Sequence, residues 1–131
     1  MLRENNINLS IVIPVYNEEQ YLEKLFLDLI KHFNSNSTEI IIVDDGSTDG
    51  STEIINNFKN ENNYKFIFEV IRLDINSGKG KALQTGIKKS NGEYILLQDA
   101  DLELDLKDSS EMYQMIQNNE EIKCIFGSRY L

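Results

Sequence analysis

The sequence predicts an α/β fold in which a mostly parallel, doubly wound sheet carries helices on both faces. Short apolar runs rich in β-branched residues alternate with longer stretches whose apolar residues recur at helical spacing. The ends of the first, second and fourth runs are chemically alike, since carboxylates recur in PVYNEE, VDDGSTD and QDADLE. A length of 131 residues suits one domain with a sizeable core and is too short for two.

The first half of the chain supplies two strands and two helices. Residues 9–15, LSIVIPV, predict a buried strand, and Pro14 suits the end of a strand better than its middle. The next stretch has one apolar helical face, formed by Leu22, Leu25, Phe26, Leu29, Ile30 and Phe33. Residues 39–45, EIIIVDD, predict a second strand. A helix then follows that Ser47 or Asp49 caps and that buries Ile54, Ile55 and Phe58.

The second half continues the alternation. Residues 66–73 predict a third strand, and the sequence NSG then predicts a turn before a helix whose inward residues are Ala82, Leu83, Gly86 and Ile87. Residues 92–98 predict a fourth strand, followed by a helix that carries Met112, Met115 and Ile116. Residues 122–128 predict a fifth strand. In parallel sheets of this kind ligands bind beyond the carboxyl ends of the strands, so the residues there are the candidate site.

The segment QDADLELD follows the fourth strand and concentrates carboxylates on a chain whose net charge is already −9. Asp99 and Asp101 stand two residues apart with a small residue between them, a spacing that can turn both carboxylates toward one hard cation. Without a cation, the close like charges would raise one pKa or splay the loop. A solvated acidic turn explains the short spacing equally well, while Asp105 fits the start of the next helix.

Two other strand ends offer groups that suit a nucleoside. In VDDGSTDG, Asp44 or Asp45 can accept a hydrogen bond from a ribose hydroxyl or a base, although taken alone the segment is better explained as a turn and helix cap. In PVYNEE, Tyr16 can stack on a base and Glu18 can bond a sugar or base. The alternatives are a core tyrosine and a glutamate that suits the start of a helix.

Basic residues near these ends suggest phosphate contacts. The segment NSGKGKALQTG lacks the glycine spacing and the Ser/Thr of a phosphate-binding loop of ATPases, and it also departs from the dinucleotide fingerprint. Lys79 and Lys81 can still supply positive charge near a pyrophosphate. Arg129, in GSRY, can pair with a phosphate in a bidentate manner or be an ordinary surface arginine.

Composition narrows the class of partner and the compartment. The chain has 13 Lys and Arg against 22 Asp and Glu, and its pI is near 4.5, so a nucleic-acid partner is not expected. The polar start of the chain and its short apolar runs predict neither a signal peptide nor a membrane span. We therefore expect a cytoplasmic location. A single cysteine, Cys124, excludes an intrachain disulfide.

Taken together, these segments resemble the family 2 inverting glycosyltransferases, whose nucleotide-sugar-binding domain has the Rossmann-like GT-A fold. The similar segments are SIVIPVYNEEQYLEKLF, EIIIVDDGSTDGSTEII, NSGKGKALQTGIKKSNGEYILLQDADLELD and FGSRYL, in the family's order and spacing. Within the family, GKGKAL, QDADLE and GSRY are similar to the dolichyl- and polyprenyl-phosphate mannose or glucose synthases.

The resemblance implies roles for particular positions. Those that hold the nucleoside are Pro14, Tyr16, Glu18, Val43 and Asp45. Those that hold the ribose-diphosphate and a Mg²⁺ or Mn²⁺ ion are Asp99, Ala100 and Asp101, with Asp101 as a direct metal ligand and Glu103 as a second one in some members. Arg129 stands where the family contacts the diphosphate or a lipid phosphate.

The resemblance also implies how the chain relates to a whole enzyme. Family members continue past the position of Leu131 with an acceptor-side segment that carries catalytic residues and often membrane-associated helices. We therefore expect residues 1–131 to be the donor-binding part of a longer enzyme, associated with the cytoplasmic face of a membrane, whose acceptor is a lipid phosphate or a saccharide. A sheet edge left without a neighbouring strand would favour homo-oligomers.

Three other classes of protein share some of these features. A phospho-receiver domain has the same size and acidic cluster, but it needs an acidic pair after the first strand, a lone phosphorylatable aspartate after the third and a lysine after the fifth. At these places the chain has Asn17 and Glu18, Asp74 before a glycine turn, and Gly127 and Arg129, which fit this pattern poorly. A nucleotidyltransferase usually places a glycine- and arginine-rich loop where this chain has VYNEEQY. A non-catalytic nucleotide-sugar-binding module is the third alternative.

Overall fold

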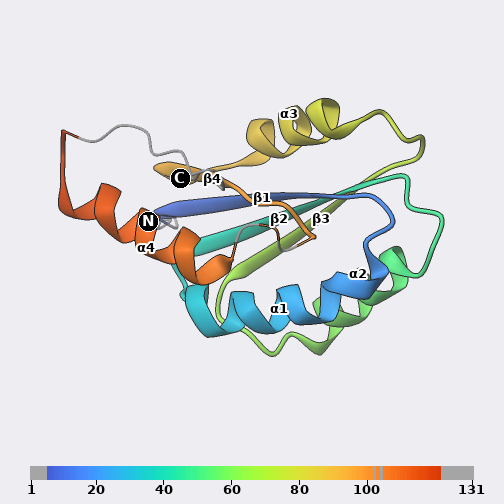
Figure 1. Ribbon diagram of the computed structural model, residues 1–131, viewed down its shortest axis with the longest axis horizontal. Coiled ribbons are helices and arrows are strands. Elements are labelled where there is room, and N and C mark those ends of the chain that lie inside the picture. Colours follow the sequence, from blue (N-terminus) through green and yellow to red (C-terminus); the bar gives the residue numbers. More distant parts are fainter. Residues whose placement is uncertain (1–5, 102, 104, 122–131) are drawn as a thin grey trace, which may run out of the picture.

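The computed structural model describes residues 6–101, 103 and 105–121, in which strands and helices alternate (Figure 1). The elements are β1 (Leu9–Val15), α1 (Glu19–Phe33), β2 (Thr38–Asp45), α2 (Ser51–Glu61), β3 (Ile67–Leu73), α3 (Lys79–Lys89), β4 (Tyr94–Leu97) and α4 (Leu106–Asn118). The α/β class and its order of elements are therefore confirmed. The predicted fifth strand, residues 122–128, and Cys124 lie outside the described residues.

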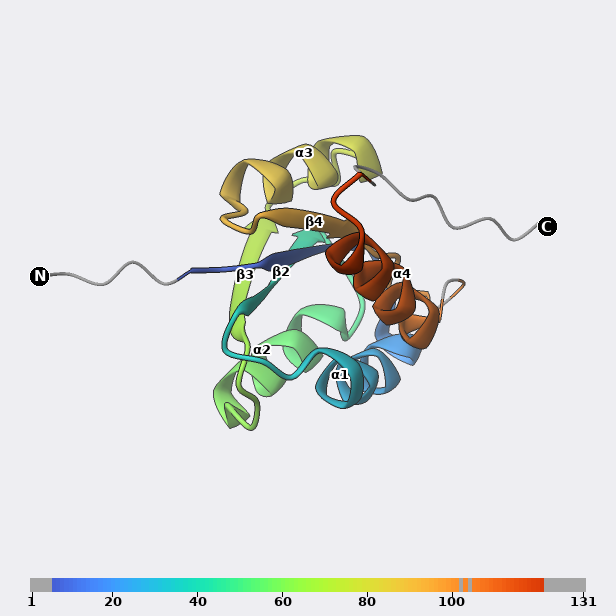
Figure 2. The same cartoon turned by 90° about the vertical axis from the view of Figure 1, so that its left-hand side faces the viewer.

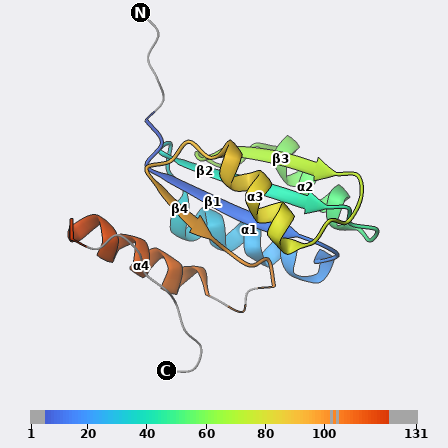
Figure 3. The ribbon, with the colours of Figure 1, turned by 90° about the horizontal axis from the view of Figure 1, so that it is seen from above.

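The described strands form one parallel sheet in the order β3-β2-β1-β4 (Figure 3). The chain moves outward from β1 through β2 to β3 and then returns to the other side of β1 to add β4. Leu9 at the start of β1 is in register with Thr38 of β2 and with Tyr94 of β4. The strand order reverses between β1 and β4, which makes the carboxyl ends of these two strands the position where such sheets bind ligands.

Helices cover both faces of the sheet (Figure 2). α1, α2 and α4 lie on one face, and α3 lies on the other. All eight residues of β2 are buried, as expected for an inner strand whose two faces are both covered. Ile40 and Ile42 belong to the core on the α1 side, whereas Ile41 and Val43 pack with Ala82 of α3.

Pro14 lies in an inner strand, yet it leaves no gap in the hydrogen bonding of the sheet. The carbonyl of Val12 accepts the N–H of Gln98, so the backbone groups of Val12 point toward β4. Backbone groups point the same way every second residue, and those of Pro14 therefore also face this side. Because β4 pairs with β1 only from Leu9 to Val12, Pro14 lies beyond the end of the pairing and needs no N–H.

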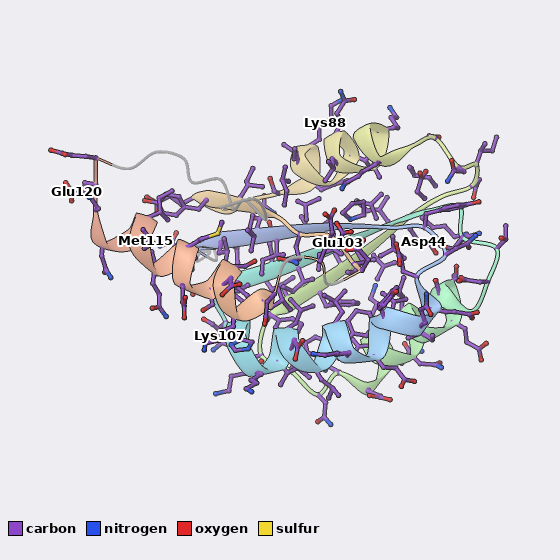
Figure 4. The ribbon with its side chains drawn as sticks, in the orientation of Figure 1. Asp44, Lys88, Glu103, Lys107, Met115 and Glu120 are labelled. Atoms are coloured by element: carbon purple, nitrogen blue, oxygen red, sulfur yellow. The ribbon has the colours of Figure 1, made fainter. Side chains whose placement is uncertain are left out.

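α3 lies close to the sheet through its smallest residues. Ala82 and Gly86 are buried, and a Cβ atom on Gly86 would lie 2.3 Å from Cγ1 of Val12. The prediction that Leu83 and Ile87 also point inward is wrong for Ile87, which is 40% exposed, and Leu83 is only partly buried. The small residues let the helix backbone approach the strands, so the larger side chains of α3 lie beside the contact. Lys88 points away from the sheet (Figure 4).

α4 is attached to the sheet through its first turn. The Asp105 side chain accepts the N–H of Lys107 and caps the helix, as its predicted position at the helix start requires. Ser109 is buried and its hydroxyl donates to Oε1 of Gln98 over 2.8 Å. Gln98 directly precedes the acidic segment, so this hydrogen bond fixes one end of that segment. Met115 is 55% exposed.

Candidate functional site

A cavity of about 430 Å³ opens at the carboxyl ends of β1, β2 and β4, where the strand order reverses. Its lining includes these residues singled out from the sequence: Pro14, Tyr16, Glu18, Asp45, Lys79, Asp99, Ala100, Asp101 and Glu103. Val43 is fully buried beneath α3 and is not among the lining residues. Arg129 lies outside the described residues. The structure thus brings together four segments that are far apart in the sequence.

The wall after β4 carries the acidic cluster. Asp99, Asp101 and Glu103 each offer a carboxylate oxygen, and these oxygens lie within 4.8 Å of one another. The Asp101 carboxylate also accepts the backbone N–H of Glu103 over 3.1 Å, which holds the turn. Clustered carboxylates are the donor set that Mg²⁺ and Mn²⁺ prefer, so these three residues fit a hard divalent cation.

The cavity has a strong excess of negative charge. Its acidic lining residues are Glu18, Asp45, Asp99, Asp101 and Glu103, whereas Lys79 is the one basic residue in the described lining. Burial raises the pKa of Glu18 above its ordinary value, and the nearby carboxylates of Asp101, Asp49 and Asp99 raise it further. The ammonium group of Lys79 forms an ion pair with Asp99. The remaining carboxylates favour the binding of a further cation.

Asp45 connects β2 to the loop that precedes α3. One of its carboxylate oxygens accepts the N–H of Ser77 over 2.7 Å, and the other accepts the N–H of Gly78 over 2.9 Å. The Asn76 side chain donates to the carbonyl oxygen of Asp45 over 3.2 Å. These bonds place Asn76 and Gly78 in the cavity lining. The sequence predicted the turn at this loop but gave no sign of its attachment to Asp45.

Asp44 points the opposite way and has a structural role. Its side chain is 1% exposed and accepts from the Thr52 hydroxyl at 2.6 Å, the Ser47 N–H at 3.0 Å and Arg72 at 2.8 Å. Burial opposes its ionisation, but the hydrogen bonds from Thr52 and Ser47 and the Arg72 charge outweigh burial, and the pKa of Asp44 lies below its ordinary value. Adjacent residues of a strand face opposite sides, which separates Asp44 (labelled in Figure 4) from Asp45.

The loop after β1 and the loop after β2 are bonded to each other, an arrangement that sequence reasoning missed. The side-chain oxygen of Asn17 accepts the N–H groups of Thr48 and Asp49 at 2.8 and 3.2 Å. The backbone N–H of Asn17 donates to Ser47 Oγ at 3.0 Å. Asn17 has a φ of 51°, the left-handed region that asparagine tolerates better than most residues. We call this set of bonds the inter-loop clasp. Glu18 is thereby held beside the acidic wall.

The predicted cap of α2 differs in detail. The helix begins at Ser51, so its cap position is Gly50. The backbone N–H of Ser51 donates to the side chain of Asp49, one residue before that position. Ser47 is used in the inter-loop clasp instead.

A parallel α/β sheet with an acidic cavity at its switch point, next to the N-terminus of a helix and a lysine, defines a domain of the nucleotide-binding class. The family model described as Glycosyl transferase family 2 matches residues 10–130. The chain belongs to this family, and its fold is of the GT-A type.

Curated and solved relatives agree with this assignment. The chain is 35% identical to a dolichyl-phosphate beta-glucosyltransferase of Dictyostelium discoideum, over 95% of this chain and 41% of that protein. The structure of S. aureus TarS residues 1–349 with UDP-GlcNAc superposes with a TM-score of 0.73 at 28% identity, over 87% of this chain and 32% of that chain. A mannosyltransferase of Pyrobaculum calidifontis with GDP-Man and Mn²⁺ shares the fold, with a TM-score of 0.67 at 23% identity over 73% of this chain and 28% of that chain. The chain thus spans less than half the length of these relatives.

Among the described residues, no helix combines the length and apolar character needed to cross a membrane.

Proposed function

We propose that this chain binds the nucleotide-diphospho-sugar donor of a glycosyltransferase, with a divalent cation, Mg²⁺ or Mn²⁺, held by Asp99, Asp101 and Glu103. The observation that carries the proposal is the position of these three clustered carboxylates at the switch point of the sheet, facing Glu18 and the N-terminus of α3. A carboxylate cluster at this place is costly for the protein without a cation. A diphosphate and a divalent cation together match the charge of the cavity.

The donor is a UDP- or GDP-sugar. The likeness to TarS bound to UDP-GlcNAc supports a UDP-sugar. Tyr16 and Glu18 at the end of β1 offer an aromatic face and a carboxylate for the nucleoside. Asp45, which lies between these residues and the β3–α3 loop, offers a further hydrogen-bond acceptor. The diphosphate would lie between Asp101 and the first turn of α3, where free N–H groups and the helix dipole favour negative charge.

The chemistry follows from these positions. A divalent cation neutralises the charge that develops on the leaving diphosphate. The carboxylates of Asp99, Asp101 and Glu103 fix the place where that charge develops, and Lys79 adds a positive charge at the edge of this cluster, beside Asp99. With the diphosphate held there, an acceptor attacks the anomeric carbon from the other face and inverts its configuration.

For the acceptor we propose a polyprenyl phosphate. The similarity to a dolichyl-phosphate beta-glucosyltransferase supports this choice. A phosphate is already anionic near neutral pH and attacks without a general base, whereas a hydroxyl acceptor needs one. We further propose that residues beyond Leu131 complete the acceptor side and that the whole enzyme works at the cytoplasmic face of a membrane. Robust sugar transfer by the 131 residues alone would contradict the first of these two statements.

Calorimetry tests the donor site directly. We expect the chain to bind at least one of UDP-glucose, UDP-GlcNAc and GDP-mannose more tightly with Mn²⁺ than with EDTA. Failure of all three donors to bind under either condition would refute the proposed function.

A pair of variants tests the metal ligands. Asp101→Asn removes a carboxylate from the cluster, and we expect it to abolish the Mn²⁺-dependent part of donor binding. Asp105→Asn removes the same charge four residues further on, and asparagine still caps α4. The control should bind donor like the unmodified chain. Equal donor affinity of the two variants would show that Asp101 is not a ligand.

A further inference from the structure

Lys79 and the candidate metal site share one ligand. The Lys79 ammonium is paired with Oδ1 of Asp99, and Asp99 is also one of the three clustered carboxylates. The ammonium group therefore stands in for a cation at the edge of the acidic cluster. A divalent ion that takes both Asp99 and Asp101 as ligands has to displace Lys79 from Asp99 or be repelled by it.

The surroundings of Lys79 leave it room to move. Its side chain is 61% exposed, and Lys79 is the first residue of α3. Gly78 and Gly80 flank it, and a Cβ atom on either glycine would meet no other atom within 4 Å. Gly78, Lys79 and Ala82 all line the cavity, so the ammonium can leave Asp99 for the space proposed for the diphosphate within the same cavity. The charge of Lys79 stays inside the cavity in both positions.

We propose that Lys79 is an exchangeable counter-ion: it holds Asp99 while the cation is absent and moves to the donor's diphosphate when the cation binds Asp99. The proposal rests on the proposed function, since it needs a cation and a diphosphate in this cavity. Its consequence is coupling between the two ligands. The cation releases Lys79 for the diphosphate, and a bound diphosphate draws Lys79 away from Asp99, so that each ligand favours the other.

The variant Lys79→Met separates the two halves of this exchange. Without the competing ammonium, Mn²⁺ alone should bind more tightly, by roughly three- to fivefold for the loss of an exposed ion pair. UDP or GDP in the presence of saturating Mn²⁺ should bind more weakly by a similar factor, because the lysine is missing from the diphosphate. The affinity for UMP or GMP should change less than the affinity for the matching diphosphate, UDP or GDP.

Lys81→Met is the matched control. It removes the same charge from the same helix two residues further on, and Lys81 is not among the residues that line the cavity. Mn²⁺ affinity is measured from the electron paramagnetic resonance signal of free Mn²⁺, and nucleotide affinity by calorimetry, all on the 131-residue chain.

Opposite shifts in the Mn²⁺ and diphosphate affinities of Lys79→Met, with both affinities of Lys81→Met near those of the unmodified chain, would support the exchange. The exchange is overturned if Lys79→Met matches Lys81→Met in either measurement, since tighter Mn²⁺ binding alone or weaker diphosphate binding alone describes a lysine with one fixed partner. A chain that binds neither UDP nor GDP would instead overturn the proposed function.

Discussion

Replacing Asp44 by alanine should destabilise the fold far more than removing an exposed carboxylate. The Asp44 side chain is 1% exposed, and its truncation leaves the Thr52 hydroxyl, the Ser47 N–H and the Arg72 guanidinium without this acceptor. Arg72 is 41% exposed and keeps its bonds to Thr52 and to the carbonyl of Ser47, so water replaces most of its lost partner.

The expected loss comes mainly from the two partly or fully buried donors. A hydrogen bond to a charged acceptor contributes about 1.5 kcal/mol or more, so the two bonds from Thr52 and Ser47 together contribute about 3 kcal/mol. For a chain of 131 residues this corresponds to a fall of roughly 10 °C in the melting temperature.

Urea denaturation followed by circular dichroism measures the change in the free energy of unfolding. The control is Asp74→Ala, which removes the same charge from an exposed position just after β3 and should change stability by less than about 0.5 kcal/mol. If Asp44→Ala is no more destabilising than Asp74→Ala, the structural role assigned to Asp44 is wrong.

Three further predictions concern acid stability, packing and assembly. The pKa of Asp44 is lower in the folded chain than in the unfolded chain. The ionised Asp44 carboxylate therefore stabilises the fold fully above pH about 4, and this stabilisation is lost as the pH falls through the folded pKa. The free energy of unfolding should fall more steeply below pH 4 in the unmodified chain than in Asp44→Ala. Gly86→Ala should lower the free energy of unfolding by about 1–2 kcal/mol, since overpacking against Val12 outweighs the helix propensity of alanine. Adding Val12→Ala to the same chain should recover part of this loss. A thermal melt in which Gly86→Ala gains stability would contradict the close packing. In the described residues β4 pairs only with β1, and Ile95 and Leu97 are 45% and 47% exposed. Light scattering should therefore show self-association that rises with concentration and that Ile95→Lys weakens. A monomer over the whole concentration range would count against association through this edge.

The strands could be predicted because a strand that is buried on both faces consists almost entirely of apolar residues. Residues 9–15 form β1 as predicted, since an inner parallel strand reads as a continuous apolar run. β4, Tyr94–Leu97, is shorter than the predicted 92–98, although the N–H groups of Glu93 and Gln98 on either side of it still bond to the carbonyls of Ile7 and Val12. Exposure of Ile87 was not predictable from spacing alone, since it depends on how closely the small residues let α3 approach the sheet.

The site was predictable as a set of segments and not as a set of contacts. Three strand ends were identified from their carboxylates and the loop before α3 from its lysines, and the parallel sheet brings these four segments together. The family resemblance singled out Asp45 rather than Asp44, and Asp45 lines the cavity. The residues alone left this choice open, because the alternation of a strand does not say which of its two faces the cavity meets. Hydrogen bonds between residues about thirty positions apart, such as that from Thr48 to Asn17, leave no local periodicity to read.

The inter-loop clasp has a consequence for engineering the donor site. Asn17 binds Thr48 and Asp49, and the Glu19 side chain accepts the N–H of Gly50 at 2.8 Å, so each loop supplies the partners of the other. A chimera that imports only one of these loops from a relative with a different donor would break bonds on both sides. The two loops are a single transplantable unit, and exchange of donor preference between relatives should start by grafting them as a pair.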